Sequence, residues 1–225
     1  MIGTIVNTST ILAGSLLGSL LKKGIKEEYQ EALFRAMGLA AVGLGLNAVV
    51  QNMQNSAFPV LFIISLAAGS LLGTFLKIDE KFQGLTARFS GNRLGEGLST
   101  GILLYCIGTL SILGPIQSAL YQDHTYLFTN ATLDFVTSTA LSSAYGIGMA
   151  LAAPVLFVWQ GSIYLLAKLL GAFLIPDMMT EISIVGGFLI AASGLGMLKI
   201  KDCKPLNMLP ALFVPVIWFG IQRLI

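Results

Sequence analysis

The sequence predicts an all-α fold, a polytopic transmembrane helical bundle of about eight segments that forms a single integral membrane domain over residues 1–225. Only 11% of the 225 residues are charged and 55% are hydrophobic, whereas soluble proteins average about 25% charged residues. The mean hydropathy is +0.82. The apolar stretches also have the ~20 residues that a helix needs to cross the hydrocarbon core. We therefore expect this chain to be embedded in a lipid bilayer.

Eight apolar segments are expected along the chain. They are 2–21, 32–50, 58–77, 97–116, 132–151, 154–175, 182–199 and 206–224. The first segment lacks a positively charged beginning, since the first lysine is Lys22, and this predicts a membrane span rather than a cleaved signal. As one helix, residues 130–175 would be ~69 Å long, more than twice the ~30 Å hydrocarbon core. The chain must break there, and Pro154, which lacks a backbone donor, is the expected place for either two full spans or a re-entrant pair.

The distribution of lysine and arginine predicts the orientation, because cytoplasmic loops hold the excess of these residues. They gather in the loops after the first, third and seventh segments, whereas the loops 51–57 and 117–130 hold none. This pattern places both termini outside and the three basic loops in the cytoplasm. The second basic loop also carries Ile78, Phe82, Leu85 and Phe89 on one helical face, which suits either a short amphipathic helix on the membrane surface or an ordinary surface loop.

Two short motifs recur in the sequence. AGSLLGSLLKK (13–23) returns as AGSLLGTFLKI (68–78), and AAVGLGL (40–46) returns more loosely as AASGLGM (191–197). An inverted repeat of the first three segments against the last three, an arrangement typical of transporters, would explain these matches. The alternative is that glycine-rich apolar sequence matches itself by chance.

Two Gly-x-x-x-Gly motifs, Gly14 with Gly18 and Gly69 with Gly73, predict close helix–helix contacts. They indicate either packing within one chain, which we favour, or a homo-oligomer that forms through these faces.

The segment LDFVTSTALSSAYGIG (133–148) is more polar than a lipid-facing helix should be. Its positions i, i+3, i+4, i+7, i+8 and i+11 form one stripe. These positions are Asp134, Thr137, Ser138, Leu141, Ser142 and Tyr145. Because polar groups that face lipid are costly, we expect this stripe to face the bundle interior or water. It could line a water or ion pathway. Alternatively, Asp134 could complement the helix dipole in the first turn, while the hydroxyls bond back to their own helix.

Other polar residues are predicted at membrane depth. Amides and hydroxyls can replace part of a cation's hydration shell, and carbonyls freed at a helix break add to this. Each of them alone is more often an interhelical hydrogen bond. Our candidate ion-pathway residues are Asp134, Ser138, Ser142, Tyr145, Gln160, Asn7, Asn47 and Thr109.

The sequence contains no motif for a catalytic site, a phosphate-binding loop or a metal-ligand cluster. We therefore expect no enzymatic activity, no cofactor and no bound metal cofactor. The net charge of +2 gives no reason to expect a nucleic-acid partner. Cys106 lies in a predicted span and Cys203 in a basic loop, so a disulfide is not expected.

Several blocks resemble the uncharacterised bacterial inner-membrane family that includes YqgA and YdfK. They are the start MIGTIVN, GEGLSTGILLYCIGTLSILGPIQSAL (95–120), LDFVTSTALSSAYGIGMALAAPVLFVWQGS (133–162) and VGGFLIAASGLGMLKIKDCKPLNMLPAL (185–212). The resemblance runs over essentially the whole chain. The positions that match the family are Asn7, Glu96, Gln117, Asp134, Gly146, Gly148, Gln160, Gly161, Asn207 and Pro210.

Since the family is labelled a possible sodium channel or pump, the resemblance implies ion transport across the bacterial inner membrane. The chain departs from the family pattern at Phe135, Asn130 and Gly196, where glycine, lysine and asparagine are expected. The last departure puts in doubt an amide ligand from the seventh segment.

Residue pattern and resemblance together predict transmembrane transport of a small ion, a cation such as sodium, by a channel or a secondary carrier. In this hypothesis Asp134 supplies charge at the outer mouth, and Ser138, Ser142 and Tyr145 line the way. The break at Pro154, together with Gln160, forms the narrow part. The alternative is a non-transporting membrane scaffold or lipid-binding protein whose polar residues only join helices.

Overall fold

The structure, a computed structural model, describes residues 1–21, 26–87, 98, 101–102, 105–106, 109–171 and 175–222, and within them every regular element is a helix. The contacts between backbone positions group the chain into two compact units. Unit 1 comprises Met1–Phe34 and Gln83–Gly171, and unit 2 comprises Arg35–Phe82 and Ala172–Ile225. The predicted all-α fold is confirmed.

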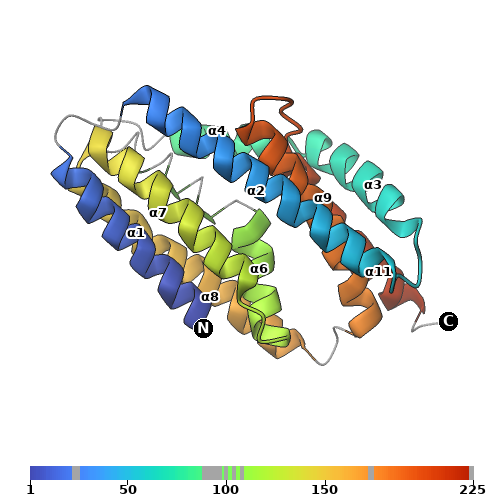
Figure 1. The fold of residues 1–225 in the computed structure, drawn as a ribbon. Helices are drawn as coiled ribbons and strands as arrows, with labels where there is room; N and C mark the ends of the chain where they lie inside the picture. The colour runs from blue at the N-terminus through green and yellow to red at the C-terminus, as the bar shows by residue number, and fades with distance from the viewer. Residues whose placement is uncertain are drawn as a thin grey trace. The chain divides into compact units, whose positions relative to one another are not determined.

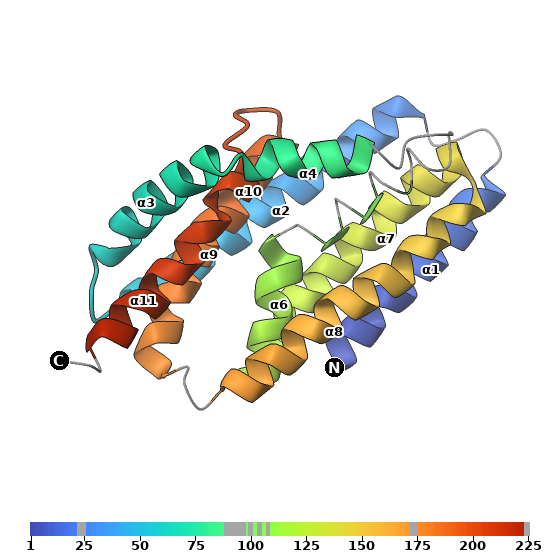
Figure 2. The ribbon, with the colours of Figure 1, turned by 180° about the vertical axis from the view of Figure 1, so that it is seen from behind.

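Unit 1 is built around three helices that lie side by side in both views (Figures 1 and 2), with a fourth against them. Its elements are α1 (Ile2–Leu20), α6 (Thr109–Leu120), α7 (Thr125–Tyr145), the 3₁₀ helix η1 (Ile147–Leu151) and α8 (Ala152–Leu170). Helices α1 and α7 run parallel, because Gly3 lies against Leu127 and Gly18 lies against Ser142. Helix α8 runs antiparallel to α1, since Gly161 faces Met1 while Ala153 packs with Ile11.

Unit 2 contains the long buried helix α9 with other helices packed around it. Its elements are α3 (Leu61–Phe75), α9 (Pro176–Met197), α10 (Pro205–Met208), the 3₁₀ helix η2 (Leu209–Leu212) and α11 (Phe213–Gln222), while α2 (Glu27–Met53) and α4 (Ile78–Ala87) have residues in both units. Helices α2 and α9 run antiparallel, because Gly45 lies against Gly187 and Gly38 against Gly194.

The eight predicted segments correspond to the observed helices. Seven of them match α1, α2, α3, α7, α8, α9 and the α10–η2–α11 stretch within two helical turns. The remaining one, 97–116, is helical at all its described positions and continues to Leu120. The outer loop predicted over 117–130 is mostly helical instead, because α6 ends at Leu120 and α7 begins at Thr125.

The helices have the length and the surface of a membrane protein. Four helical stretches of the described chain are long and apolar enough to cross a bilayer: Ile2–Leu20, Ile147–Leu170, Pro176–Met197 and Pro205–Gln222. Helices α1 and α8 expose large apolar side chains along their length, among them Leu16, Leu20, Val158, Leu165 and Leu169. Apolar surface on this scale indicates contact with lipid.

The chain reverses between α7 and α8, as predicted, but the structure places the break at Gly146 rather than at Pro154. Gly146 ends α7 with φ 90° and ψ 179°, a backbone conformation that is essentially restricted to glycine. Pro154 lies in the first turn of α8, where its missing N–H would have no intrahelical partner in any case. The helix break at Pro154 that was expected to form the narrow part with Gln160 is therefore not present.

The Gly-x-x-x-Gly faces are used inside their own units. A Cβ atom on Gly14 would collide with Ser138 and come within 2.5 Å of the carbonyl oxygen of Phe135 on α7. Gly69 and Gly73 lie equally close to the backbone of η2 and α10. Each face is covered by a neighbouring helix of the same chain, which agrees with the packing within one chain that we favoured, and the homo-oligomer through these faces stays a prediction.

Helix α4 confirms that the second basic loop begins with a helix, although Phe89 of its predicted apolar face lies outside the described residues. The division into units does not separate the first three predicted segments from the last three, since α1 groups with α6, α7 and α8. The inverted repeat stays a prediction.

Candidate functional site

The polar stripe of α7 faces the interior of unit 1. Asp134, Thr137, Ser138 and Ser142 are buried, with exposed fractions of at most 6%, and Tyr145 is half-buried. Ser138 and Ser142 lie against Gly14 and Gly18 of α1. The packing of α1 against α7 therefore removes this stripe from the surface.

Asp134 lies deep in α7. It comes nine residues after Thr125, the first residue of the helix, which corresponds to about 13 Å along the axis. The alternative interpretation of Asp134 as a first-turn residue that complements the helix dipole is therefore wrong. The side chain is 4% exposed, and its Oδ2 accepts a hydrogen bond of 2.9 Å from Nδ2 of Asn130, one turn earlier.

The Asp134 carboxylate has no ion-pair partner among the basic side chains that the structure describes. A buried carboxylate without a counter-charge is strongly unfavourable. Either a proton or a bound cation must therefore compensate its charge.

Asn7 of α1 is fully buried and faces Asp134. Within the described part of the chain, neither its Oδ1 nor its Nδ2 forms a hydrogen bond of acceptable geometry. The Asn7 amide interacts with the carboxylate without forming a hydrogen bond of regular geometry, and its Oδ1 is available to a small ligand.

Four further buried side chains of unit 1 also have a polar atom without a partner among the described residues. They are Thr4 (Oγ1), Ser15 (Oγ), Tyr105 (the phenolic oxygen) and Gln160 (Oε1). Each buried polar atom left unpaired costs about 1–3 kcal/mol. Native proteins contain few such atoms, so a group of them in one unit requires an explanation.

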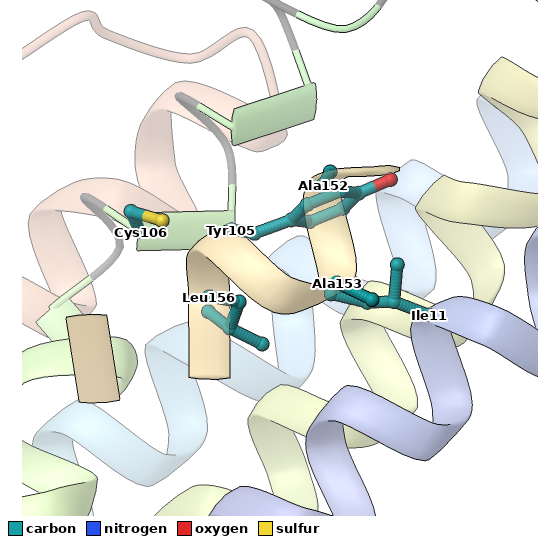
Figure 3. Close-up of a cluster of buried hydrophobic side chains, with 6 residues drawn as sticks. All are labelled: Ile11, Tyr105, Cys106, Ala152, Ala153 and Leu156. Carbon is teal, nitrogen blue, oxygen red and sulfur yellow. The ribbon is translucent and has the colours of Figure 1, made fainter. Parts of the chain in front are cut away.

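Tyr105 connects this polar region to the apolar core of unit 1. Its ring packs in a cluster with Ile11, Cys106, Ala152, Ala153 and Leu156, as Figure 3 shows, and its hydroxyl points away from Cys106. Tyr105 and Cys106 also lie close enough to Asp134 to feel its charge. The carboxylate thus lies near an apolar cluster, where a low effective dielectric constant strengthens its electrostatic interactions.

Other polar side chains of the unit are satisfied. The hydroxyls of Thr137 and Ser138 donate to backbone carbonyls of α7 itself. Ser142 donates to the carbonyl oxygen of Ser15 on α1 at 2.7 Å, and lies 2.9 Å from that of Gly146. These groups join or stabilise helices, as the alternative interpretation expects.

Gln160 has one polar atom with a hydrogen-bond partner and one without. Its Nε2 donates to Oγ of Ser111 at 3.0 Å and so joins α8 to α6, while its Oε1 has no partner in the described structure. The Gln160 carbonyl remains available to a ligand.

The polar residues of α1 and α7 form two rows that run alongside each other, because these helices are parallel. From Thr4 to Ser15 the row on α1 covers twelve residues, a distance of about 16 Å at the rise of an α-helix. This is roughly half of the ~30 Å hydrocarbon core. Carboxylate, amide and hydroxyl oxygens arranged in this way can replace the hydration shell of a small cation.

The structure does not bring every predicted residue to this region. Asn47 belongs to unit 2 and is exposed. Thr109 begins α6, but its side chain lies outside the described residues. The parts assigned to these two residues stay predictions.

Sequence reasoning missed three buried polar residues, one of which bonds to Asp134. Asn130 drew attention only as a departure from a family pattern, although its spacing of four residues from Asp134 predicts a contact on a helix. Thr4 could have been found in the same way, since it lies three residues before Asn7. Glu181 of α9 was also missed, because it precedes the predicted span 182–199 by one residue.

Cys106 and Cys203 are both free thiols. Among the residues that the structure describes, no three His, Cys, Asp or Glu side chains come together as a metal site would require.

A family model described as "Protein of unknown function (DUF554)" matches residues 2–220. The chain is 54% identical over 215 residues to the "Uncharacterized membrane protein YdfK" of Bacillus subtilis (strain 168), an alignment that covers 96% of this chain and 94% of that protein. It is 28% identical to the "Uncharacterized protein YqgA" of Escherichia coli (strain K12), over 95% and 94% of the two chains. No solved structure matches the chain. With a family model that matches nearly its whole length, the chain belongs to the DUF554 family.

Proposed function

We propose that this protein moves a small monovalent cation such as sodium across the bacterial inner membrane, and that the cation meets Asp134 inside unit 1. One observation carries the proposal. The buried Asp134 carboxylate has no described basic partner, and the amide oxygen of the neighbouring Asn7 has no hydrogen-bond partner within the described structure.

The energetics favour a ligand at this place. Two unit charges about 4 Å apart attract by roughly 4 kcal/mol at an effective dielectric constant near 20. A cation at Asp134 would gain this attraction and would also supply a partner for the Asn7 carbonyl oxygen. Binding would thus remove part of the cost of the unpaired buried atoms, which is about 1–3 kcal/mol for each.

The relative directions of the helices support a polytopic arrangement. In unit 1, α1 is parallel to α7 and antiparallel to α8, which are the directions that alternating membrane crossings require. We infer the orientation from the basic loops, with both termini outside and the Lys199–Lys204 loop in the cytoplasm. Since the sequence holds no phosphate-binding loop, an ion gradient or the membrane potential would drive transport, by a channel or a secondary carrier.

A membrane scaffold or lipid-binding protein is the second candidate. Its supporting observation is the hydrogen bond from Ser142 to the Ser15 carbonyl, together with the back-bonded hydroxyls of Thr137 and Ser138. In such a protein the buried polar groups would only hold helices together.

Ion uptake by the purified protein in liposomes separates the two candidates. Sodium, potassium, proton and chloride fluxes would be measured with imposed gradients, with protein-free liposomes and an unrelated reconstituted membrane protein as controls. We expect uptake of a monovalent cation above both controls. If no cation is taken up by correctly folded protein, the transport proposal fails and the scaffold function is favoured.

A further inference from the structure

Unit 2 contains a second buried carboxylate. Glu181, in the second turn of α9, is 1% exposed. Its Oε2 is buried and has no hydrogen-bond partner in the part of the chain that the structure describes. As with Asp134, no described basic side chain forms an ion pair with it.

The other oxygen of Glu181 is well satisfied. Its Oε1 accepts a hydrogen bond of 2.6 Å from Oγ of Ser56 and one of 3.0 Å from the backbone N–H of Phe58. Both donors belong to the connection between α2 and α3. These two bonds fix the orientation of the side chain and leave Oε2 as the oxygen without a partner in the described structure.

The helix that carries Glu181 is similar in sequence to the one that carries Asp134. TLDFVTSTALSSAYGIGM (132–149) and TEISIVGGFLIAASGLGM (180–197) share their first threonine and the pattern Ala-x-Gly-x-Gly-Met at the end. In this alignment without gaps, Asp134 and Glu181 occupy neighbouring positions. The two carboxylates therefore occupy nearly the same position in two similar sequence stretches.

The helices that accompany α7 and α9 are also related. Helix α1 contains AGSLLG (13–18) and runs parallel to α7, and α3 contains AGSLLG (68–73). Helix α3 runs parallel to α9, because Phe58 just before it bonds to Glu181 while Phe62 stacks on Phe188 further along both helices. Each unit thus contains an AGSLLG helix that runs parallel to a helix with one buried carboxylate, although the glycines face that helix only in unit 1 and face α10 and η2 in unit 2.

We propose that Glu181, with Ser56 beside it, forms a second binding site for a small monovalent metal cation, so that each unit of the protein holds one such site. The inference deepens the proposed function, on which it rests only for the identity of the cation. The cation would bind at Oε2, the oxygen that faces no donor, while Oε1 keeps its bonds to the loop before α3.

The charge of this buried carboxylate requires compensation, by a proton or by a metal ion. Its Oε2 has no hydrogen-bond partner among the described residues. A metal ion there would take oxygen ligands, for which the carboxylate itself and the nearby Ser56 hydroxyl, which donates to Oε1, are available.

Equilibrium binding of radioactive sodium to purified protein in detergent tests this inference without transport. Glu181→Gln keeps a carbonyl oxygen for Ser56 and Phe58 but loses the charge. We expect it to halve the number of sodium ions bound per chain, as Asp134→Asn should, while the double variant should bind none. The matched control is Glu28→Gln, which removes an exposed carboxylate of α2 and should leave the number of bound ions unchanged.

The outcomes separate this inference from the proposed function. Unchanged binding by Glu181→Gln, with binding abolished by Asp134→Asn, would overturn the second site and leave the first intact. Normal binding at both sites without any flux in liposomes would contradict transport but support the inference.

Wild-type protein offers a second measurement if Glu181→Gln does not fold. A hydrophobic carbodiimide modifies buried carboxyl groups in their transiently protonated form, and mass spectrometry identifies the residue. At constant pH, sodium should suppress modification of Glu181 several-fold relative to choline. Modification that falls only as the pH is raised, with no effect of sodium or potassium, would overturn the metal site in favour of a proton.

Discussion

Asn7 is fully buried against Asp134, although its amide forms no hydrogen bond of regular geometry within the described structure. A leucine has the same branching as asparagine and would avoid about 1–3 kcal/mol of unpaired polar atoms. Selection for stability alone would favour an apolar side chain over an amide at this position. The residue is therefore explained more readily by a ligand than by folding.

Replacing Asn7 by leucine should separate stability from transport. We expect the midpoint of thermal unfolding in detergent to stay the same or rise, while cation uptake into liposomes falls at least several-fold. The control is Asn52→Leu, whose amide bonds to its own helix at Ala48 and whose loss should not change uptake. A large loss of stability in Asn7→Leu would instead assign the amide a structural role.

The burial of Asp134 could be predicted from the sequence, but its surroundings could not. The 3.6-residue periodicity placed Asp134, Ser138 and Ser142 on one face. The start of the helix was predicted too late, because a stretch without lysine or arginine was taken as an outer loop. The Asp123 carboxylate, which accepts a hydrogen bond from the Thr125 N–H, was the overlooked signal for a helix start.

At the scale of the elements, the contact between α1 and α7 depends on glycine. Gly14→Ala would push a methyl group into Ser138 and the Phe135 carbonyl. We expect a loss of about 1–3 kcal/mol of stability, as for other overpacked contacts. Thermal unfolding in detergent measures it, with Gly43→Ala as the control, because no described atom lies within 4 Å of a Cβ atom built there.

Size-exclusion chromatography of the same variants tests the assignment of this face. If Gly14→Ala unfolds like the wild type but changes the oligomeric state, then the face joins subunits and the packing described here is contradicted.

The connection between α7 and α8 depends on Gly146 in a different way. Its φ of 90° with ψ near 180° is sterically unfavourable for any residue with a Cβ atom, at a cost of about 1–3 kcal/mol. Gly146→Ala should therefore lower the unfolding temperature and reduce uptake, because alanine would be strained in the backbone conformation that turns the chain back. Gly196→Ala, at a helical position with open space, should be close to neutral. Equal stability of the two variants would show that the break tolerates a side chain.

The position of this break illustrates what a sequence pattern leaves open. The length of residues 130–175 required a reversal, and the reversal is present. Pro154 was the expected place by residue type, but a proline is tolerated in the first turn of a helix. Only the backbone conformation, which no periodicity reports, distinguishes the two positions.

At the scale of the whole molecule, the grouping of helices into units could not be predicted. Apolar segments in lipid have no hydrophobic preference for one partner over another, so close packing and polar contacts decide which helices meet. The glycine motifs predicted that α1 and α3 would each pack closely against another helix. They did not predict that α1 packs against α7 or that α3 packs against the α10–η2 stretch. The packing partner depends on how well the surfaces of two folded helices fit each other, which the sequence of one helix does not report.

The orientation in the membrane can be tested at Cys203. This thiol is half-exposed in a basic loop, whereas Cys106 is buried. We expect a membrane-impermeant maleimide to label Cys203 only after the cells are permeabilised, because lysine-rich loops stay in the cytoplasm. Ready labelling in intact cells would reverse the topology, and Cys203→Ser provides the control for background reaction.

Sodium uptake by Asp134→Asn is the most direct test of the central claim, that a cation passes the buried carboxylate of unit 1. The amide keeps the shape of the side chain and loses only the charge, so folding and expression should be preserved. The matched control is Asp177→Asn, since Asp177 is an exposed carboxylate in the first turn of α9. The account predicts that Asp134→Asn lowers sodium uptake roughly tenfold or more, because 1.4 kcal/mol of lost attraction already gives a factor of ten. Equal sodium uptake by wild type, Asp134→Asn and Asp177→Asn at the same protein content would contradict it.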